Sequence, residues 1–339
     1  MTPPDDDPRP RFKVWEGGKA RSQPADDVPV WPQHYRLDLL AGQEAKPVEW
    51  RVQDLVPTGL GLLVGRPKRG KSWMALAMVI ACADGTDFMG RVMTRRCKDV
   101  LYLALEDGEE RIIRRVHKLG GRFPQNVIMV HDWTPGISLI EYLNTMLNQY
   151  PGIELVIVDA WAIVKPGQNP RRGVYDNDYS DLRPVHQLAK DRKITILLVH
   201  HTRKADASDV IDTINGSTAY AGCSDFFLIL QRERSQNYGT LALDGRDVIG
   251  QDYGLLWDPA TCQWTCQGPI EQVRQQQAES QQDQVLAFLR LQAHPLTARE
   301  ISLELGLKYH SVRKFLTRLR EHGVVFERKY RWSVHEQEG

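Results

Sequence analysis

Cysteine, long apolar runs and an excess of charge of either sign are all missing from this sequence. Its 339 residues include 5 cysteines, too few and too scattered for a disulfide framework. The longest apolar run, Trp73–Ala83, is far shorter than the ~20 residues that cross a bilayer. Because 44 Lys and Arg balance 43 Asp and Glu, the net charge of +1 favours no class of partner by itself.

The first residues also lack the basic and apolar regions of a secretory signal, so we expect a cytoplasmic protein with no membrane partner. The composition predicts four parts. Residues 1–47 are rich in proline and form a disordered or loosely packed arm, and residues 48–266 form a large domain. A Gln-rich stretch, 267–282, is a linker or a solvated helix, and 283–336 is a small domain of helices and a hairpin.

Short apolar runs alternate with helical patterns through the large domain, as in an α/β fold with a mainly parallel sheet. The runs suit strands that are buried on both faces. They are Gly61–Val64, Val100–Leu105, Val127–Val130, Leu155–Val158, Ile194–Val199 and Phe226–Leu230, with edge strands expected at Thr240–Leu243 and Gln263–Cys266. Helices are expected over Ser72–Ala83, Glu109–Leu119, Leu139–Tyr150 and Leu182–Asp191.

The strongest motif is a phosphate-binding loop of the form G-x4-G-K-[ST], between an apolar run and a helical one. Its glycines allow successive N–H groups to converge on phosphate oxygens at a helix N-terminus. Lys71 would reach the β- and γ-phosphates, and the Ser72 hydroxyl would coordinate Mg²⁺. The sequence therefore predicts an ATP site made of Gly65, Arg66, Pro67, Lys68, Arg69, Gly70, Lys71, Ser72 and Trp73.

Two further strands end in acids, which would meet at the same edge of a parallel sheet. Asp159 follows Leu155–Val158 and is the expected second Mg²⁺ ligand, the Walker B acid. Glu106 follows Val100–Leu105 and is the expected base for the attacking water. The alternative is that Glu106 and Asp107 only cap the next helix.

A third strand, Ile194–Val199, ends in His200 and His201. A donor at this edge could hydrogen-bond the γ-phosphate and report its loss. Neighbouring side chains on a strand point to opposite faces, so the two histidines are not expected to chelate one metal ion.

Together these segments resemble the RecA-like P-loop ATPases, and among them the RepA-like (AAA_25) hexameric replicative helicases of plasmids, phages and integrated elements. The likeness runs from Trp50 to about Gly250. It rests on the phosphate loop, Leu105–Asp107 with Arg111 and Arg114, Val156–Asp159, Val199–Lys204, and Gly216–Thr218 ahead of Ala221 and Asp225.

The resemblance implies a homohexameric ring with ATP bound between neighbouring subunits. It assigns Lys71, Asp159 and Glu106 the roles given above and makes His201 the γ-phosphate sensor. It also implies an arginine finger from the adjacent subunit, for which Arg232 and Arg234 are the candidates, with Arg246 as a third. The alternative is that these arginines are ordinary surface residues.

In the same likeness, two loops that face the ring axis bind single-stranded DNA. The first is Pro166–Ser180 with Arg171 and Arg172, and the second is Arg203–Asn215, which opens with Arg203 and Lys204. Contacts to phosphates without sequence preference are the expected mode. The alternative is a pair of solvated surface loops.

The C-terminal part resembles a winged helix-turn-helix. Thr297 and Glu300 have the spacing of a capping box, and Tyr309–His322 is an amphipathic helix before a basic hairpin tip. Residues 308–331 hold eight Lys or Arg and two Glu, a net charge of +6, which indicates contact with duplex DNA through Arg313, Lys314, Arg328 and Lys329. A protein-interaction module is the alternative.

These observations predict an ATP-driven replicative DNA helicase of a mobile element, with a primase or an initiator protein as a further partner. Two other functions stay open. One is a DNA-binding regulator whose ATPase switches assembly without unwinding, and the other is a recombinase-like filament.

Overall fold

The structure, a computed structural model, describes residues 37, 44, 47–90, 93–167, 169–201, 219–233, 236–292 and 294–334. Contacts divide the chain into two units, Met1–Pro47 and Val48–Gly339. Every element below belongs to the second unit. The expected arm over 1–47 falls almost wholly outside the described residues, so its character stays a prediction.

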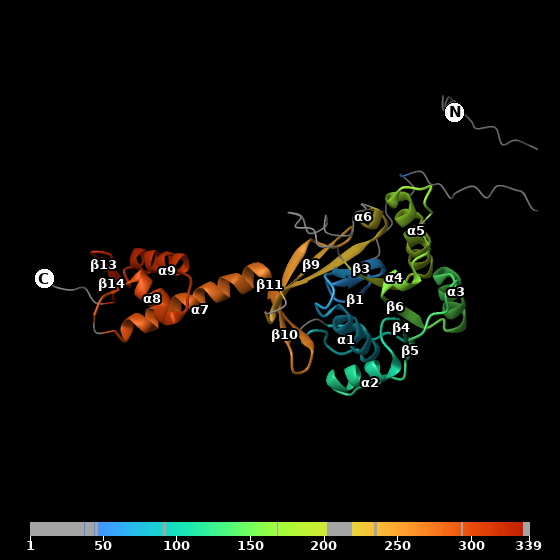
Figure 1. The fold of residues 1–339 in the computed structure, drawn as a ribbon, viewed down its shortest axis with the longest axis horizontal. Coiled ribbons are helices and arrows are strands. Elements are labelled where there is room, and N and C mark those ends of the chain that lie inside the picture. The colour runs from blue at the N-terminus through green and yellow to red at the C-terminus, as the bar shows by residue number, and fades with distance from the viewer. Residues whose placement is uncertain are drawn as a thin grey trace, which may run out of the picture. The chain divides into compact units, whose positions relative to one another are not determined.

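A central sheet of nine strands organises the large domain, and six of its strands are parallel (Figure 1). The six predicted apolar runs are confirmed as strands with small changes at their ends. They lie in the order β8-β3-β7-β6-β4-β5. Their bounds are β3 (Gly59–Gly65), β4 (Asp99–Ala104), β5 (Val127–Val130), β6 (Ile153–Asp159), β7 (Thr195–His201) and β8 (Phe226–Arg232).

Three antiparallel strands extend the sheet beyond β8, namely β9 (Tyr238–Gly245), β10 (Gln251–Asp258) and β11 (Gln263–Pro269). The sequence indicated β9 and β11 but not β10. Gly254 and the acids Asp252 and Asp258 weaken the strand pattern of β10, because glycine and aspartate disfavour strands. Before the sheet, β1 (Trp50–Val52) and β2 (Val56–Pro57) form a short antiparallel pair.

Helices cover both faces of the parallel strands (Figure 1). One face packs against α1 (Lys71–Asp84) and α2 (Glu109–Lys118), which bury Met78 and Ile112. The other packs against α3 (Leu139–Gln149), α4 (Trp161–Val164), α5 (Val174–Arg192) and α6 (Ala219–Cys223), which bury Leu143 and Val185. The predicted α/β class is confirmed. None of the helices that the structure describes has the length and apolar composition needed to cross a membrane.

The C-terminal part has a hydrophobic core of its own, with Val285, Ile301, Phe315 and Trp332 at its centre. Thr297 and Glu300 exchange the two hydrogen bonds of a capping box, as predicted. A sheet of order β12-β14-β13 completes it. The elements are α7 (Ile270–Arg290), β12 (Leu296–Thr297), α8 (Ala298–Leu305), α9 (Tyr309–Glu321), β13 (Phe326–Arg328) and β14 (Arg331–Ser333).

Helix α7 runs unbroken through the expected boundary between residues 282 and 283, so the Gln-rich stretch is helical from Ile270 onward. At its start, Val273 packs against Gly254 of β10, where a Cβ would lie 3.1 Å from the valine Cγ2. At its end, Val285 and Leu289 belong to the C-terminal core. One helix thus contacts both the antiparallel strands and the C-terminal elements.

Candidate nucleotide site

The glycine-rich loop joins β3 to α1 at the carboxyl edge of the sheet, as the motif predicts. Gly65 ends β3, and a Cβ there would lie 2.5 Å from the carbonyl oxygen of Leu230, so only glycine fits. Gly70 is the N-cap of α1 and adopts the left-handed φ of 100°, which favours glycine. Between them Arg66, Pro67 and Lys68 are exposed. The loop thus has the strand–turn–helix geometry that anion binding at a helix N-terminus requires.

Lys71 lies buried inside the loop, with 4% of its side chain exposed. Its Nζ donates hydrogen bonds to the carbonyl oxygens of Gly65 at 2.7 Å and Arg66 at 3.0 Å. It also lies 2.9 Å from Nδ1 of His201, at the end of β7. Burial lowers the pKa of Lys71 to about 8, although the charges of Asp159 and Glu106 oppose the shift.

His201 connects this lysine to the acid that ends β4. Its Nε2 lies 3.3 Å from Oε1 of Glu106. Because an ammonium group only donates, Nδ1 of His201 must accept from Lys71. The neutral imidazole then carries its proton on Nε2 and donates it to Glu106. Lys71, His201 and Glu106, which the sequence placed on three separate segments, therefore form one hydrogen-bonded chain.

Asp159 ends β6 beside this chain and is 2% exposed. Burial raises its pKa to about 6, and the neighbouring charges of Glu106 and Asp107 add to the shift, whereas a hydrogen bond from Ser72 opposes it. The Tyr102 hydroxyl lies 3.4 Å from its Oδ2. A serine hydroxyl in contact with a buried carboxylate is a set of hard oxygen donors, which fits Mg²⁺.

Asp107, its partner Arg115 and Tyr102 are site residues that the sequence did not single out. Asp107 is 5% exposed and makes ion pairs with Arg111, at 3.0 Å, and with Arg115. The Arg115 guanidinium lies over the ring of Trp73, 5.1 Å from its centre. The N-cap of α2 is Gly108, with no side-chain capping bond. The spacing of Asp107, Arg111 and Arg115 by four residues was the signal that could have revealed these pairs.

His200 points to the other face of the sheet. Its ring stacks on Tyr220 with a centroid distance of 4.9 Å, and burial lowers its pKa to about 4, so it is neutral at pH 7. Tyr220 accepts a hydrogen bond from Nε1 of Trp161 and lies beneath the ammonium of Lys165, which pairs with buried Asp178. The two adjacent histidines thus lie on opposite faces, as strand alternation predicts.

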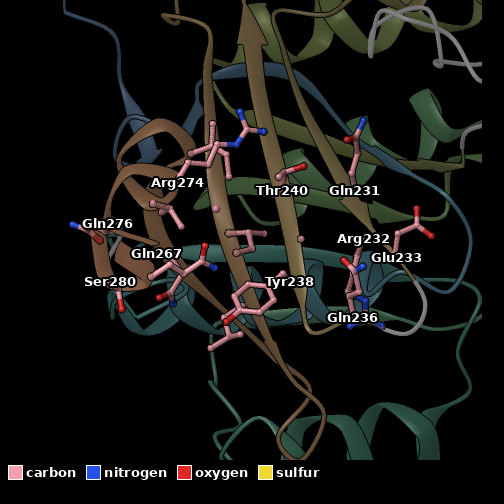
Figure 2. A pocket seen from close by; sticks show the side chains of 17 residues that line it. Gln231, Arg232, Glu233, Gln236, Tyr238, Thr240, Gln267, Arg274, Gln276 and Ser280 are labelled. Carbon is pink, nitrogen blue, oxygen red and sulfur yellow. The ribbon is translucent and has the colours of Figure 1, made fainter. Parts of the chain in front are cut away.

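Of the candidate arginine fingers, the structure describes Arg232 and Arg246, and Arg234 lies outside the described residues. Arg232 ends β8, and its guanidinium lies 4.7 Å from the ring centre of Trp257 and 5.4 Å from that of Trp264. Figure 2 shows it beside Glu233 and Gln236 at the rim of a cavity of about 850 Å³ between strands β8–β10 and α7. The finger role of Arg232 and Arg234 stays a prediction.

The first expected DNA loop, Pro166–Ser180, is shorter than predicted. Helix α5 begins at Val174, because Asn177 folds back to bond the loop backbone. Its Oδ1 accepts from the Asn169 N–H, and its Nδ2 donates to the carbonyls of Asn169, Arg172 and Gly173. Arg171 and Arg172 remain exposed. The second loop, with Arg203 and Lys204, lies outside the described residues.

In the C-terminal part, the four basic residues expected to meet duplex DNA are exposed. Arg313 and Lys314 lie on α9, and Arg328 and Lys329 lie at the hairpin tip. Two other cations of this segment are used internally. Arg320 pairs with Glu327 and lies over the Trp332 ring, and Arg331 donates to the Pro295 carbonyl.

A glycine-rich loop at the carboxyl edge of a parallel sheet that continues into antiparallel strands defines a RecA-like P-loop domain. A family model described as an AAA domain (AAA_25) matches residues 32–207, more than half of the sequence, and the chain belongs to this family. No protein with a curated description matches it.

Two solved structures are similar. One is titled as an isolated ATPase domain, and the other as "The Structure Of A DnaB-Like Replicative Helicase And Its Interactions With Primase". Each match has 15% identity, a TM-score of 0.50 and covers 61% of this chain. The matches cover 84% of the first structure's chain but only 58% of the second's, less than two thirds of its length. At this identity the likeness establishes the fold.

Proposed function

We propose that the protein hydrolyses ATP and uses the energy to move along DNA as a ring-forming replicative helicase. The observation that carries the proposal is the hydrogen-bonded chain from Lys71 through His201 to Glu106. It brings together a phosphate-binding cation, a sensor and a carboxylate base, the three groups that phosphoryl transfer to water needs.

In this proposal the N–H groups of the loop and Lys71 bind the phosphates, and Ser72 and Asp159 hold Mg²⁺. A bound Mg²⁺ supplies positive charge beside the β- and γ-phosphates. Glu106 accepts a proton from the attacking water, whose oxygen bonds to the γ-phosphorus while the bond to the β–γ bridging oxygen breaks. The products are ADP and inorganic phosphate. His201 senses the γ-phosphate through the contacts it makes with Lys71 and Glu106.

We further propose that six copies assemble with ATP between neighbours, where Arg232 or Arg234 of one copy meets the phosphates held by the next. Arg171 and Arg172 of the first loop and Arg203 and Lys204 of the second would contact single-stranded DNA. The exposure of Arg171 and Arg172 supports this assignment.

The C-terminal part would act as a winged helix-turn-helix domain that binds duplex DNA through Arg313, Lys314, Arg328 and Lys329, all of them exposed. The likeness to a replicative helicase solved for its interactions with primase supports a primase or an initiator as partner. A cytoplasmic protein of a plasmid, phage or other mobile element fits this set of functions.

The test compares wild type with Lys71→Ala and Glu106→Gln in ATPase assays with and without single-stranded DNA. We expect Lys71→Ala to lose nucleotide binding, and Glu106→Gln to bind Mg·ATP but to lose hydrolysis by at least about 100-fold. Strand displacement on a forked duplex separates the helicase from a non-unwinding switch, and electron micrographs separate rings from filaments. Full turnover by either variant would remove the assignment of its residue.

A further inference from the structure

A tryptophan from the antiparallel strands contacts the phosphate loop at the residue where α1 begins. Trp264 lies on β11, 194 positions from Gly70, and its indole Nε1 donates a hydrogen bond of 3.4 Å to the Gly70 carbonyl. A Cβ on Gly70 would lie 2.9 Å from that nitrogen. The loop and the indole are therefore in direct contact, and Trp264 is only 5% exposed.

The indole is held in place from several sides. The ring of Trp257, its partner across β10 and β11, lies 5.0 Å away at an interplanar angle of 57°. The guanidinium of Arg232 lies against both rings. On β9, a Cβ on Gly239 would lie 3.0 Å from the Trp264 ring, so this glycine leaves the space that the indole fills. A side chain packed this closely has little freedom to leave Gly70.

The hydrogen bond acts on one particular peptide group. In a trans peptide the C=O and the N–H point in opposite directions. When the Gly70 carbonyl points toward Trp264 and also accepts the first helical bond from Met74, at 3.0 Å, the Lys71 N–H points away from both. That direction is toward the turn of the loop, where N–H groups must converge to bind an anion.

We propose that Trp264 is a positioning residue for the phosphate loop, which it orients by holding the Gly70–Lys71 peptide. Since β11 continues directly into α7, which reaches the C-terminal core, Trp264 also makes the loop respond to displacement of that helix. The effect on nucleotide affinity rests on the proposed function, whereas the effect on the loop itself does not.

The test is amide hydrogen exchange of residues 68–73 in the full-length protein without nucleotide. Trp264→Phe removes the indole N–H, and we expect exchange of these amides to become about three to ten times faster, the range for one lost hydrogen bond. Trp332→Phe is the matched control, because Trp332 is equally buried, at 5%, but lies in the C-terminal core. It should leave the exchange of the loop unchanged.

A second variant, Trp264→benzothienylalanine, keeps the shape of the indole and replaces its N–H with sulfur, so that folding is preserved if the Phe variant does not fold. In both variants the Kd for Mg·ATP should rise by about three- to tenfold, with a smaller change in kcat. Unchanged exchange in the benzothienylalanine protein, or an equal increase in Trp332→Phe, overturns the proposal. If wild type binds no Mg·ATP, the proposed function fails and the exchange data still decide the role of Trp264.

Discussion

The ammonium nitrogen of Lys71 lies 2.9 Å from Nδ1 of His201, although 130 positions separate the two residues in the chain. The same imidazole reaches Glu106 through its other nitrogen. A change in what Lys71 binds can therefore reach the base through one aromatic ring, because both ring nitrogens are engaged. This arrangement explains how one histidine at a strand end can serve as a sensor.

We expect His201→Ala to lower kcat for ATP hydrolysis by about 10- to 1,000-fold while the Kd for Mg·ATP changes less than about threefold. The reason is that His201 orients Lys71 and Glu106, whereas the loop N–H groups bind most of the phosphate charge. His201→Gln, which keeps one donor and one acceptor, should recover part of the rate. Stopped-flow binding and steady-state hydrolysis measure the two quantities, and an equal loss in both would contradict the sensor role.

Asp159→Asn is expected to abolish hydrolysis and yet to stabilise the protein at pH 8. Burial raises the pKa of Asp159 from 3.8 to about 6, so the folded state binds this proton more tightly than the unfolded chain does. Its contribution to the free energy of unfolding is present below pH 3.8 and lost as the pH rises through about 6. The asparagine variant avoids this loss, which amounts to about 2–3 kcal/mol.

Urea unfolding in EDTA at several pH values measures this difference. Wild type and Asp159→Asn should have the same stability near pH 4 and diverge above pH 6. A constant difference across the range would show that the carboxylate is not destabilised by burial. Glu106→Gln, which replaces a half-exposed carboxylate, serves as the control and should show no such divergence.

Asn177→Ala should destabilise the protein by about 1–3 kcal/mol, because it leaves backbone groups of the first loop without their partner. The variant should also weaken the stimulation of ATPase by single-stranded DNA, since Arg171 and Arg172 lie on the segment that Asn177 holds. Asn148→Ala is the control, because Asn148 is exposed and accepts one bond from Arg192. Equal stability of Asn177→Ala and wild type in urea would refute this role.

Arg313→Ala should weaken duplex DNA binding about three- to tenfold and reduce the salt dependence of log Kd by about one phosphate contact. Arg313 is exposed on α9, where a phosphate can reach it, whereas Arg320 pairs with Glu327. Arg320→Ala should instead lower the thermal stability of the C-terminal part. Fluorescence anisotropy of a labelled duplex at several salt concentrations distinguishes the two. Similar losses of affinity in both variants would argue against a specific binding face.

The site was largely predictable where it depends on local chemistry. The loop from Gly65 to Ser72 needs two glycines between a strand and a helix, and the acids Glu106 and Asp159 each follow an apolar run. Such features are set by residues close in the chain, whose backbone preferences and burial are legible from the sequence. The start of α5 was missed, because the side chain of Asn177, and not the apolar pattern, decides where that helix begins.

The sequence by itself determined the six parallel strands, the phosphate loop and the acids at the edge of the sheet. Only the tertiary structure decided that Lys71, His201 and Glu106 form one chain, that Asp107 pairs with Arg115, and that Trp264 bonds Gly70. The physical reason is the order of the strands. Which strand ends lie side by side depends on how the whole sheet buries its apolar faces, and no short segment of the chain contains that information.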